Sequence, residues 1–218
     1  MVLPSLLFSV PVSALVRETG GNRIAGNAGR GPDFLRYTAA FSIIVIGAFM
    51  FSIPLMADIP SVISALHIDT LYVAVLSLIG FAGFVLAGYL SDRYGRGYVA
   101  IGFAGSGAVS GIMLYLTGVS HYLLPVLALV YVSSGFFSFS GIWVSEHYPP
   151  GSRGLATNIV FFSGRLVGGF SPFIAALIDP PSLVSGIALV GIAAALISLV
   201  ASAYVQGIRP HHSAGTLK

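Results

Sequence analysis

The stretch Gly88-Tyr89-Leu90-Ser91-Asp92-Arg93-Tyr94-Gly95-Arg96 lies between two long apolar runs of the sequence. Each run is long enough to cross a bilayer, which requires about 20 apolar residues in a helix. The stretch places one acid and two arginines within five positions, although only 8% of the whole chain is charged. A short hairpin that concentrates charge between two membrane spans is uncommon, and it therefore decides how the rest of the sequence is interpreted.

Each residue type in this hairpin has a physical reason. Asp92 can pair with an arginine, for which Arg153 and Arg96 are the candidates, or cap the N-terminus of a neighbouring helix. Gly95 permits a tight turn, and Gly88 is expected to permit close packing near the helix end. Arg93 and Arg96 are expected to anchor the turn in the cytoplasm. A simple positively charged hairpin would need neither the acid nor both glycines.

The composition excludes a water-soluble protein. The chain has 218 residues, of which 56% are hydrophobic, whereas soluble domains are about 25% charged. Cysteine is absent, which excludes disulfides and thiolate metal sites. The ten cations are too few and too dispersed for a nucleic-acid partner, and no histidine has a set of ligands around it. We therefore expect a lipid bilayer as the surroundings, and neither a metal nor another cofactor.

Six apolar runs predict an all-α membrane protein with six transmembrane helices, because continuous runs do not alternate as barrel strands do. Residues 1–33 are expected to be the tail of a helix whose beginning is missing, followed by a cytoplasmic linker, although an interfacial or disordered start is an alternative. Residues 34–205 would form the bundle, and residues 206–218 a cytoplasmic tail. The predicted spans are 35–57, 70–90, 98–118, 122–145, 154–178 and 182–205.

Positive charge is confined to alternate connections between the spans. Nine of the ten cations lie before the first span or at its second residue, between spans two and three, between spans four and five, or after the sixth. The other three loops, near 58–69, 119–121 and 179–181, contain no lysine or arginine. The positive-inside rule then predicts a multi-pass protein of the plasma membrane with both termini in the cytoplasm.

A second cluster, Glu146-His147-Tyr148-Pro149-Pro150-Gly151-Ser152-Arg153-Gly154, connects spans four and five on the same side as the first. Glu146 and Arg153 bracket a turn that includes Pro149. The first cluster resembles the signature cytoplasmic loop, G-x-L-S-D-R-x-G-R, of the major facilitator superfamily. The second resembles the E-x-[FY]-P-x-x-x-R-[AG] loop between the tenth and eleventh helices of these transporters, in particular the sugar and metabolite:proton symporters.

The resemblance covers nearly the whole chain but only the C-terminal half of the family fold. It implies a six-helix half-bundle with a 3+3 inverted repeat, and a complementary six-helix half as partner. It also implies alternating-access transport of a small polar or anionic metabolite, with proton-coupled symport. We see no strong sequence repeat that would support the internal symmetry.

Arg165 is the ionisable residue that lies deep inside a predicted span, about 12 residues or ~18 Å from its start. Such residues are functional candidates with an expected partner, yet the six predicted spans contain no acid. The partner could be an anionic substrate, a carboxylate of the other half, or water and carbonyls. A structural arginine that extends towards the cytoplasm is the alternative. Asn158 lies seven residues earlier on the same helical face, and the segment from Asn158 to Arg165 resembles the Asn…Gly-Arg segment of the symporters.

Serines give the fourth span a polar side. Ser134 and Ser138 are candidates for substrate contact, because the resemblance places spans one and four around the central cavity. Hydrogen bonds between helices are the alternative for these hydroxyls. Trp143, near the cytoplasmic end of the same span, is expected to be an interfacial anchor.

Two other classes of protein compete with a transporter. An intramembrane serine protease needs G-x-S-G and a histidine in another span, but the motif is absent and every histidine is peripheral, so an enzyme is not expected. A truncated membrane protein that does not transport is the stronger alternative, since half of a rocking transporter has no second wall for its cavity.

Overall fold

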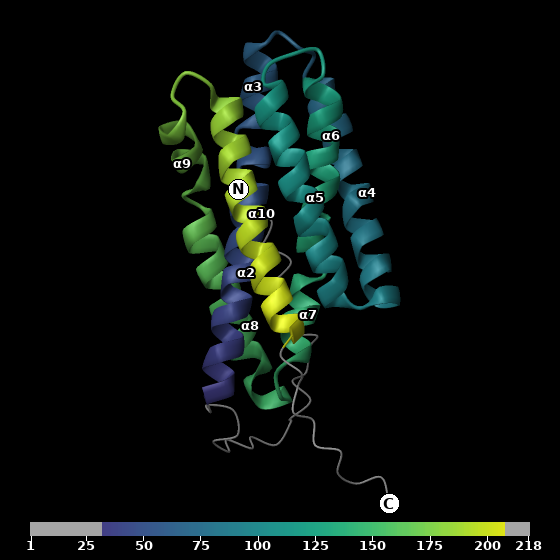
Figure 1. The fold of residues 1–218 in the computed structure, drawn as a ribbon, viewed down its shortest axis with the longest axis vertical. Coiled ribbons are helices and arrows are strands. Elements are labelled where there is room, and N and C mark those ends of the chain that lie inside the picture. The colour runs from purple at the N-terminus through teal and green to yellow at the C-terminus, as the bar shows by residue number, and fades with distance from the viewer. Residues whose placement is uncertain (1–31, 208–218) are drawn as a thin grey trace, which may run out of the picture.

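A computed structural model describes residues 32–207 of the chain, and the side chains from Phe34 onwards. The predicted helix tail and almost all of the linker and of the C-terminal tail lie outside these residues. Within them the fold is all-α, and six helical segments are long and apolar enough to cross a membrane. This confirms the predicted fold class of six transmembrane helices (Figure 1).

Three of the six spans are single helices and three are interrupted. The single helices are α4 (Leu71–Tyr94), α5 (Arg96–Thr117) and α10 (Leu183–Gly207). The first span is α2 (Pro32–Ala57) with α3 (Ile59–Ala65). The fourth is α6 (Leu123–Ser133), the 3₁₀ helix η1 (Ser134–Phe137) and α7 (Ser140–Glu146), and the fifth is α8 (Pro150–Gly168) with α9 (Ser171–Ile178).

The helices extend further than the apolar runs predicted. The first span continues through α3 into the stretch that the sequence assigned to a loop. The charged hairpin is almost entirely helical as well, because α4 ends at Tyr94 and α5 begins at Arg96. Polar residues at the ends of a span still form helix, since helical hydrogen bonds satisfy the backbone in the headgroup region too.

At the interruptions of the spans, side-chain hydroxyls donate hydrogen bonds to backbone carbonyls that would otherwise lack a donor. Pro172 has no N–H to give to the carbonyl of Gly168, and the hydroxyl of Ser171 donates to that carbonyl at 2.6 Å instead. Where α2 ends, the buried hydroxyl of Tyr131 donates to the carbonyl of Leu55 at 2.8 Å. Each bond satisfies a carbonyl near a helix end, a position where helices leave acceptors unpaired.

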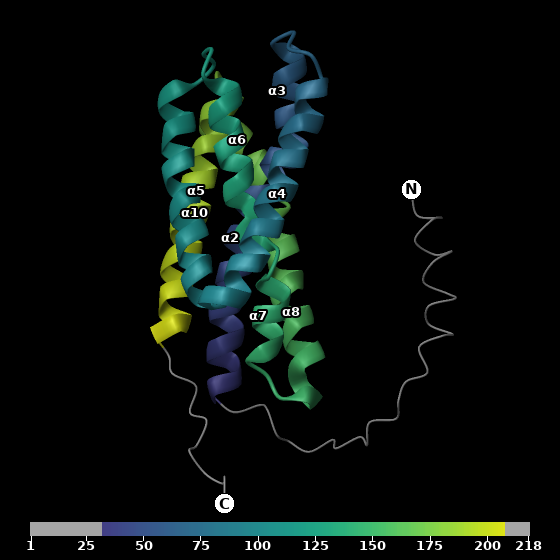
Figure 2. The same ribbon diagram turned by 90° about the vertical axis from the view of Figure 1, so that its right-hand side faces the viewer.

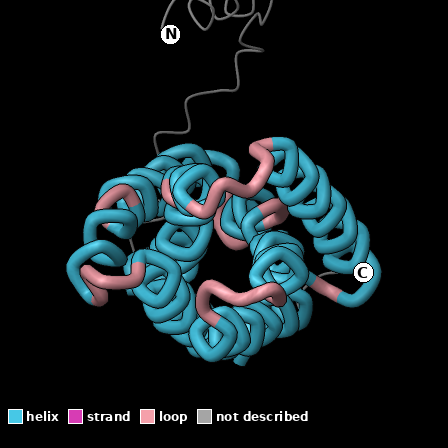
Figure 3. The backbone as a smooth tube through the Cα atoms, turned by 90° about the horizontal axis from the view of Figure 1, so that it is seen from above, coloured by secondary structure: helices cyan, strands magenta, loops and turns pink. Residues whose placement is uncertain are grey.

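The helix α2 is the centre of the bundle. Its most extensive contacts are with α10 and α8, and α10 packs in turn along α5. The helix α4 packs on α6, η1 and α5. Figure 1 accordingly places α9 at the edge of the bundle opposite α4, and Figure 2 shows α5 and α10 together on one side. Viewed along the bundle, the loops of the end that lacks arginine lie nearest to the reader (Figure 3).

Glycines allow the closest helix contacts, in particular at two G-x-x-x-G spacings, Gly107–Gly111 of α5 and Gly164–Gly168 of α8. A Cβ on Gly164 would lie 2.8 Å from the ring of Phe49, and one on Gly168 would lie 3.1 Å from the backbone nitrogen of Met50. A Cβ on Gly111 would lie 2.9 Å from Ile192 of α10. The spacings therefore serve packing of α8 on α2 and of α5 on α10.

Adding a methyl group at Gly168 tests this packing. Gly168→Ala should lower the free energy of unfolding by about 1–3 kcal/mol, because the backbone of α2 cannot yield to the new Cβ. Thermal unfolding in detergent is the measurement. Gly154→Ala is the matched control, since that glycine is exposed on the same helix with open space around it. Equal effects of the two substitutions would contradict the assignment.

Candidate functional site

The first motif forms a turn of one residue between α4 and α5. Gly95 has φ +92°, a conformation that L side chains rarely adopt, and its N–H donates to the carbonyl of Ser91 at 3.1 Å. The glycine is therefore required by the turn, as predicted. Gly88 makes no close contact among the described residues, because a Cβ there would meet no atom within 4 Å.

Arg96 joins the two sequence motifs. Its Nη1 lies 2.7 Å from an Oε2 of Glu146, and its Nη2 lies 3.7 Å from Oδ1 of Asp92. The Arg96 side chain is 18% exposed, against 51% for Glu146 and 77% for Asp92. The N–H bonds of Nη1 do not point squarely at the Glu146 oxygen, so the contact is a close charge pair rather than a well-aligned hydrogen bond.

Asp92 thus has one of its two predicted partners. Arg96, one turn further along the chain, lies within reach of its carboxylate. Arg153, the other predicted partner, is exposed in the first turn of α8, and no ion pair joins the two in the part of the chain that the structure describes. Arg93 is also exposed and lies over the ring of Tyr94 at 5.6 Å. The motif pair that sequence reasoning missed is Arg96 with Glu146.

The second motif is fixed to the start of α2. The hydroxyls of Tyr148 and Thr38 are 2.9 Å apart and buried, and the ring of Phe34 meets Tyr148 edge to face at 5.4 Å. Burial raises the pKa of the Tyr148 phenol above its usual value, and the hydrogen bond with Thr38 offsets only part of this rise. Pro149 then precedes α8 in an extended conformation, and its carbonyl accepts the N–H of Arg153 at 3.1 Å.

Trp143 is a core residue, and the prediction of an interfacial anchor is wrong. Its side chain is only 4% exposed, and its ring meets Phe41 of α2 edge to face at 5.1 Å. His147 completes the cluster: its Nδ1 lies 2.9 Å from the carbonyl of Trp143, and its ring meets Phe41 at 4.9 Å. The indole of Trp143 thus faces α2 rather than lipid. An indole suits a packed core as well as a membrane interface, so the residue type alone does not decide between them.

Arg165 lies near the middle of the fifth span, on its exposed surface. It is 15 residues beyond Pro150, or ~22 Å along a helix. Asn158 is exposed on the same helix. Among the described residues, neither side chain forms a hydrogen bond or an ion pair with the bundle. The polar network predicted for Arg165 and Asn158 is therefore not formed within the described bundle.

Asp58 corrects the expectation that the spans contain no acid. It lies between α2 and α3, inside the first span as the structure has it. Its Oδ2 is buried, and none of the described residues donates a hydrogen bond to it. The sequence placed Asp58 in a loop because the apolar run ends immediately before it.

The two candidate serines of the fourth span occupy different surroundings. Ser134 is buried, donates to the carbonyl of Tyr131 at 2.6 Å, and lines a cavity of about 260 Å³. This cavity lies where α4 meets α6, η1 and the end of the first span. Ser138 is exposed and does not line it. The neighbouring Ser133 serves helix packing, since it accepts the hydroxyl of Ser106 of α5 at 3.1 Å.

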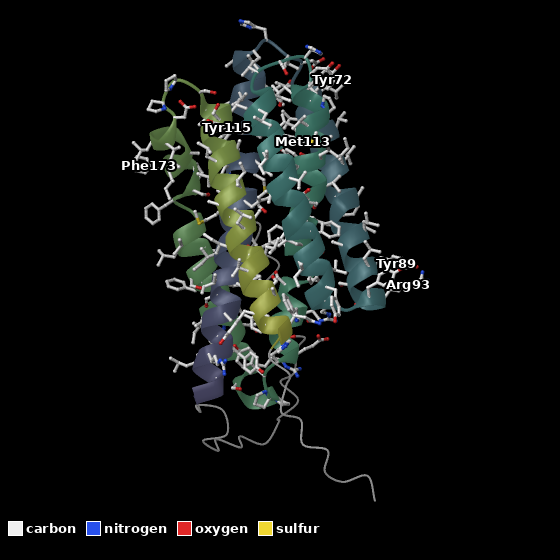
Figure 4. The ribbon with its side chains drawn as sticks, viewed as in Figure 1. Tyr72, Tyr89, Arg93, Met113, Tyr115 and Phe173 are labelled. Atoms are coloured by element: carbon white, nitrogen blue, oxygen red, sulfur yellow. The ribbon has the colours of Figure 1, made fainter. Side chains whose placement is uncertain are left out.

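Two spans are markedly less buried than the other four. In the most apolar stretch of α4, 22% of the residues are buried, and in that of the fifth span 28%, whereas the other spans reach 44% to 61%. Tyr72, Tyr89 and Arg93 project outward from α4, and Phe173 from α9, in Figure 4. The exposed surfaces of these two spans therefore need either lipid or another membrane protein against them.

The six spans and the ionic contact between two charged turns at one end define a multi-pass, all-helical membrane protein. The sequence model of the Major Facilitator Superfamily matches residues 1–172, which is more than half of the chain. The chain belongs to this superfamily.

A relative from Haemophilus influenzae (strain ATCC 51907 / DSM 11121 / KW20 / Rd) bears the name "Putative metabolite transport protein" and is 37% identical over 95 residues. The match covers 43% of this chain and 23% of the relative, so the chain corresponds to a part of that protein. No solved structure matches the chain significantly.

A double-mutant cycle tests the contact between the motifs. Arg96→Gln and Glu146→Gln should each lower the free energy of unfolding, and the pair should show a coupling of about 0.5–1 kcal/mol, as expected of a partly exposed ion pair. Chemical or thermal unfolding in detergent measures it.

Asp92→Asn provides the comparison within the same cluster. Because its carboxylate is more exposed and further from Arg96, its coupling to Arg96→Gln should be the smaller of the two. A larger coupling for Asp92 than for Glu146 would reject the geometry.

Proposed function

We propose that this chain is half of a secondary transporter that moves a small polar or anionic metabolite across the plasma membrane by alternating access. The other half would be a complementary six-helix bundle that supplies the second wall of a central cavity. Membership of the superfamily supports transport in general. Solute, coupling and partner are parts of the proposal.

The position of Arg165 carries this proposal. A charged side chain at mid-bilayer costs at least about 2.5–3.5 kcal/mol and almost always faces a protein interior or a water-filled cavity. Arg165 lies at this depth on an exposed surface, and the described bundle gives it no partner. A second bundle against α8 would give it a polar interior, an anionic solute or a carboxylate.

The contact of Arg96 with Glu146 supports a role in the transport cycle. It ties the α4–α5 turn to the end of the fourth span at one end of the bundle. Asp92 is largely exposed beside it, so its carboxylate is free to bind a cation or a helix N-terminus of the other half when that end closes. Reopening would break these contacts, and they are weak enough to be reversible.

Proton-coupled symport follows from the resemblance to metabolite:proton symporters. Among the acids whose side chains the structure describes, Asp58 lies within the first span and the others lie at span ends or between spans, and none forms an ion pair with Arg165. We therefore assign the proton-binding carboxylate of the cavity to the other half. A non-transporting, truncated membrane protein is the competing proposal, favoured by the fact that one bundle alone has no second wall.

The orientation can be tested by cysteine labelling, because the chain has no native cysteine. Ser120→Cys, in the loop after α5, should react with an impermeant reagent added outside intact cells, and Ser152→Cys should react only after the membrane is opened. Both termini would then be cytoplasmic, as the distribution of arginine requires. The reverse labelling pattern would overturn this orientation.

Uptake into proteoliposomes tests the function. We expect no transport by the chain alone, and transport when a complementary half is present, enhanced by an imposed proton gradient. Arg165→Gln should reduce uptake at least tenfold, since it removes the mid-span charge. Ser163→Ala on the same helix, which keeps that charge, should have little effect.

Two results would count against this proposal. Robust uptake by the monomeric chain alone would reject the half-transporter. Full uptake by the Arg165→Gln complex would assign that arginine a structural role.

A further inference from the structure

The cavity lined by Ser134 offers hydrogen-bond acceptors but no free side-chain donor. It is about 260 Å³ in volume and reaches the surface at Met56, Ser77 and Phe81, which are exposed. Its lining is largely apolar, and its side-chain hydroxyls are those of Ser77, Tyr131 and Ser134. None of the lining residues carries a formal charge.

Every one of these hydroxyls already donates its hydrogen to a backbone carbonyl. Ser77 donates to Val73 at 2.8 Å, and Ser134 to Tyr131 at 2.6 Å. Tyr131 donates to Leu55 at 2.8 Å. A hydroxyl has one hydrogen and two acceptor lone pairs. The three oxygens can therefore still accept hydrogen bonds, but they have none left to donate.

We infer that this cavity binds a small, neutral organic molecule that has an apolar body and a hydroxyl group. The hydroxyl would donate to a free lone pair of Ser77, at the exposed mouth of the cavity, and the apolar body would lie against Phe81 and Phe84. An anion needs donors or cations, which this lining does not offer, and an ammonium group would lose its hydration without a carboxylate to replace it.

A lipid acyl chain fits the observations less well than this ligand. An acyl chain would fill the volume but leave the acceptor oxygens of the three hydroxyls unused. A ligand with a hydroxyl group uses this remaining acceptor capacity, and an acyl chain cannot.

This inference rests on the proposed function only in taking the ligand to be the transported solute or a part of it. It restricts the chemistry of that solute. The part of the solute bound between α4 and α6 would be neutral, and any anionic group of the solute would have to bind elsewhere, as at Arg165.

Binding can be measured without transport. The full chain in nanodiscs is titrated with three matched probes, 4-fluorobenzyl alcohol, 4-fluorotoluene and 4-fluorobenzoate, and followed by ¹⁹F NMR, with empty nanodiscs as the blank. The alcohol should bind saturably above the blank. The toluene, which lacks a donor, should bind at least fivefold more weakly, as expected for one lost hydrogen bond. The benzoate should not bind above the blank.

Variants then locate the site. Ser77→Ala should weaken binding of the alcohol about fivefold, as expected for one lost hydrogen bond. Phe81→Trp should abolish it by filling the cavity. Ser163→Ala is the matched control, because this hydroxyl of α8 also donates to its own helix, at 2.8 Å to Val160. Ser77 is exposed, so its variant should fold.

Three results would overturn the inference: equal binding of alcohol and toluene, which would indicate a lipid groove; tighter binding of the benzoate; or unchanged alcohol binding by Ser77→Ala. Failure of the proposed function is separate. Serine-dependent binding of the alcohol with no uptake in the presence of any partner half would leave the cavity assigned and reject transport.

Discussion

The close approach of α2 to its neighbours is the contact on which the bundle depends. Lipid chains are as apolar as leucine, so burial of apolar surface does not drive these helices together, and packing must. Phe49 of α2 fits against Gly164 and Gly168 of α8, and Gly47 of α2 lies against Ser198 and Ala194 of α10. Because α8 and α10 both pack on α2, crowding at either contact would separate one side of the bundle from the rest.

The lipid bilayer also determines where charged side chains can lie. Four of the five arginines within residues 34–207 lie at the end of the bundle that carries the two motifs, where water and headgroups hydrate them. A partly exposed pair such as Arg96 with Glu146 contributes about 1 kcal/mol or less. The cost of a charge at mid-span is several times larger. Arg165 therefore constrains what lies against the bundle more strongly than the contact between the motifs does.

Structural features that depend only on neighbouring residues could be predicted from the sequence. Runs of apolar residues determine which segments can span, and a glycine with positive φ determines a tight turn, so both the six spans and the role of Gly95 were predictable. The ends of the spans were less so, because α3 and the charged turn are polar enough to look like loops while their backbone still forms helix.

Facing direction could not be predicted from hydropathy. In a membrane an apolar side chain is equally suited to lipid and to the core, so the pattern does not say which way a residue points. Trp143 was thus expected at the interface and lies in the core, while Gly88 was expected in a contact and has open space beside it. The pairing of Arg96 with Glu146 depends on how α5 sits beside α7, which only the three-dimensional structure supplies.

The four-residue 3₁₀ helix Ser134–Phe137 has a consequence for the phase of the whole fourth span. A 3₁₀ helix advances about 120° per residue and an α-helix about 100°, so four residues overwind the chain by roughly 80°. Ser134 and Ser138, which an unbroken α-helix would place on one face, are consequently turned apart, one buried and one exposed. The same rotation sets the direction in which α7 presents Trp143 and Glu146. This short overwound turn therefore sets the rotation of α7 relative to α6. With that rotation Tyr131 and Ser134 line the cavity, while Trp143 and Glu146 of α7 reach their partners on α2 and α5.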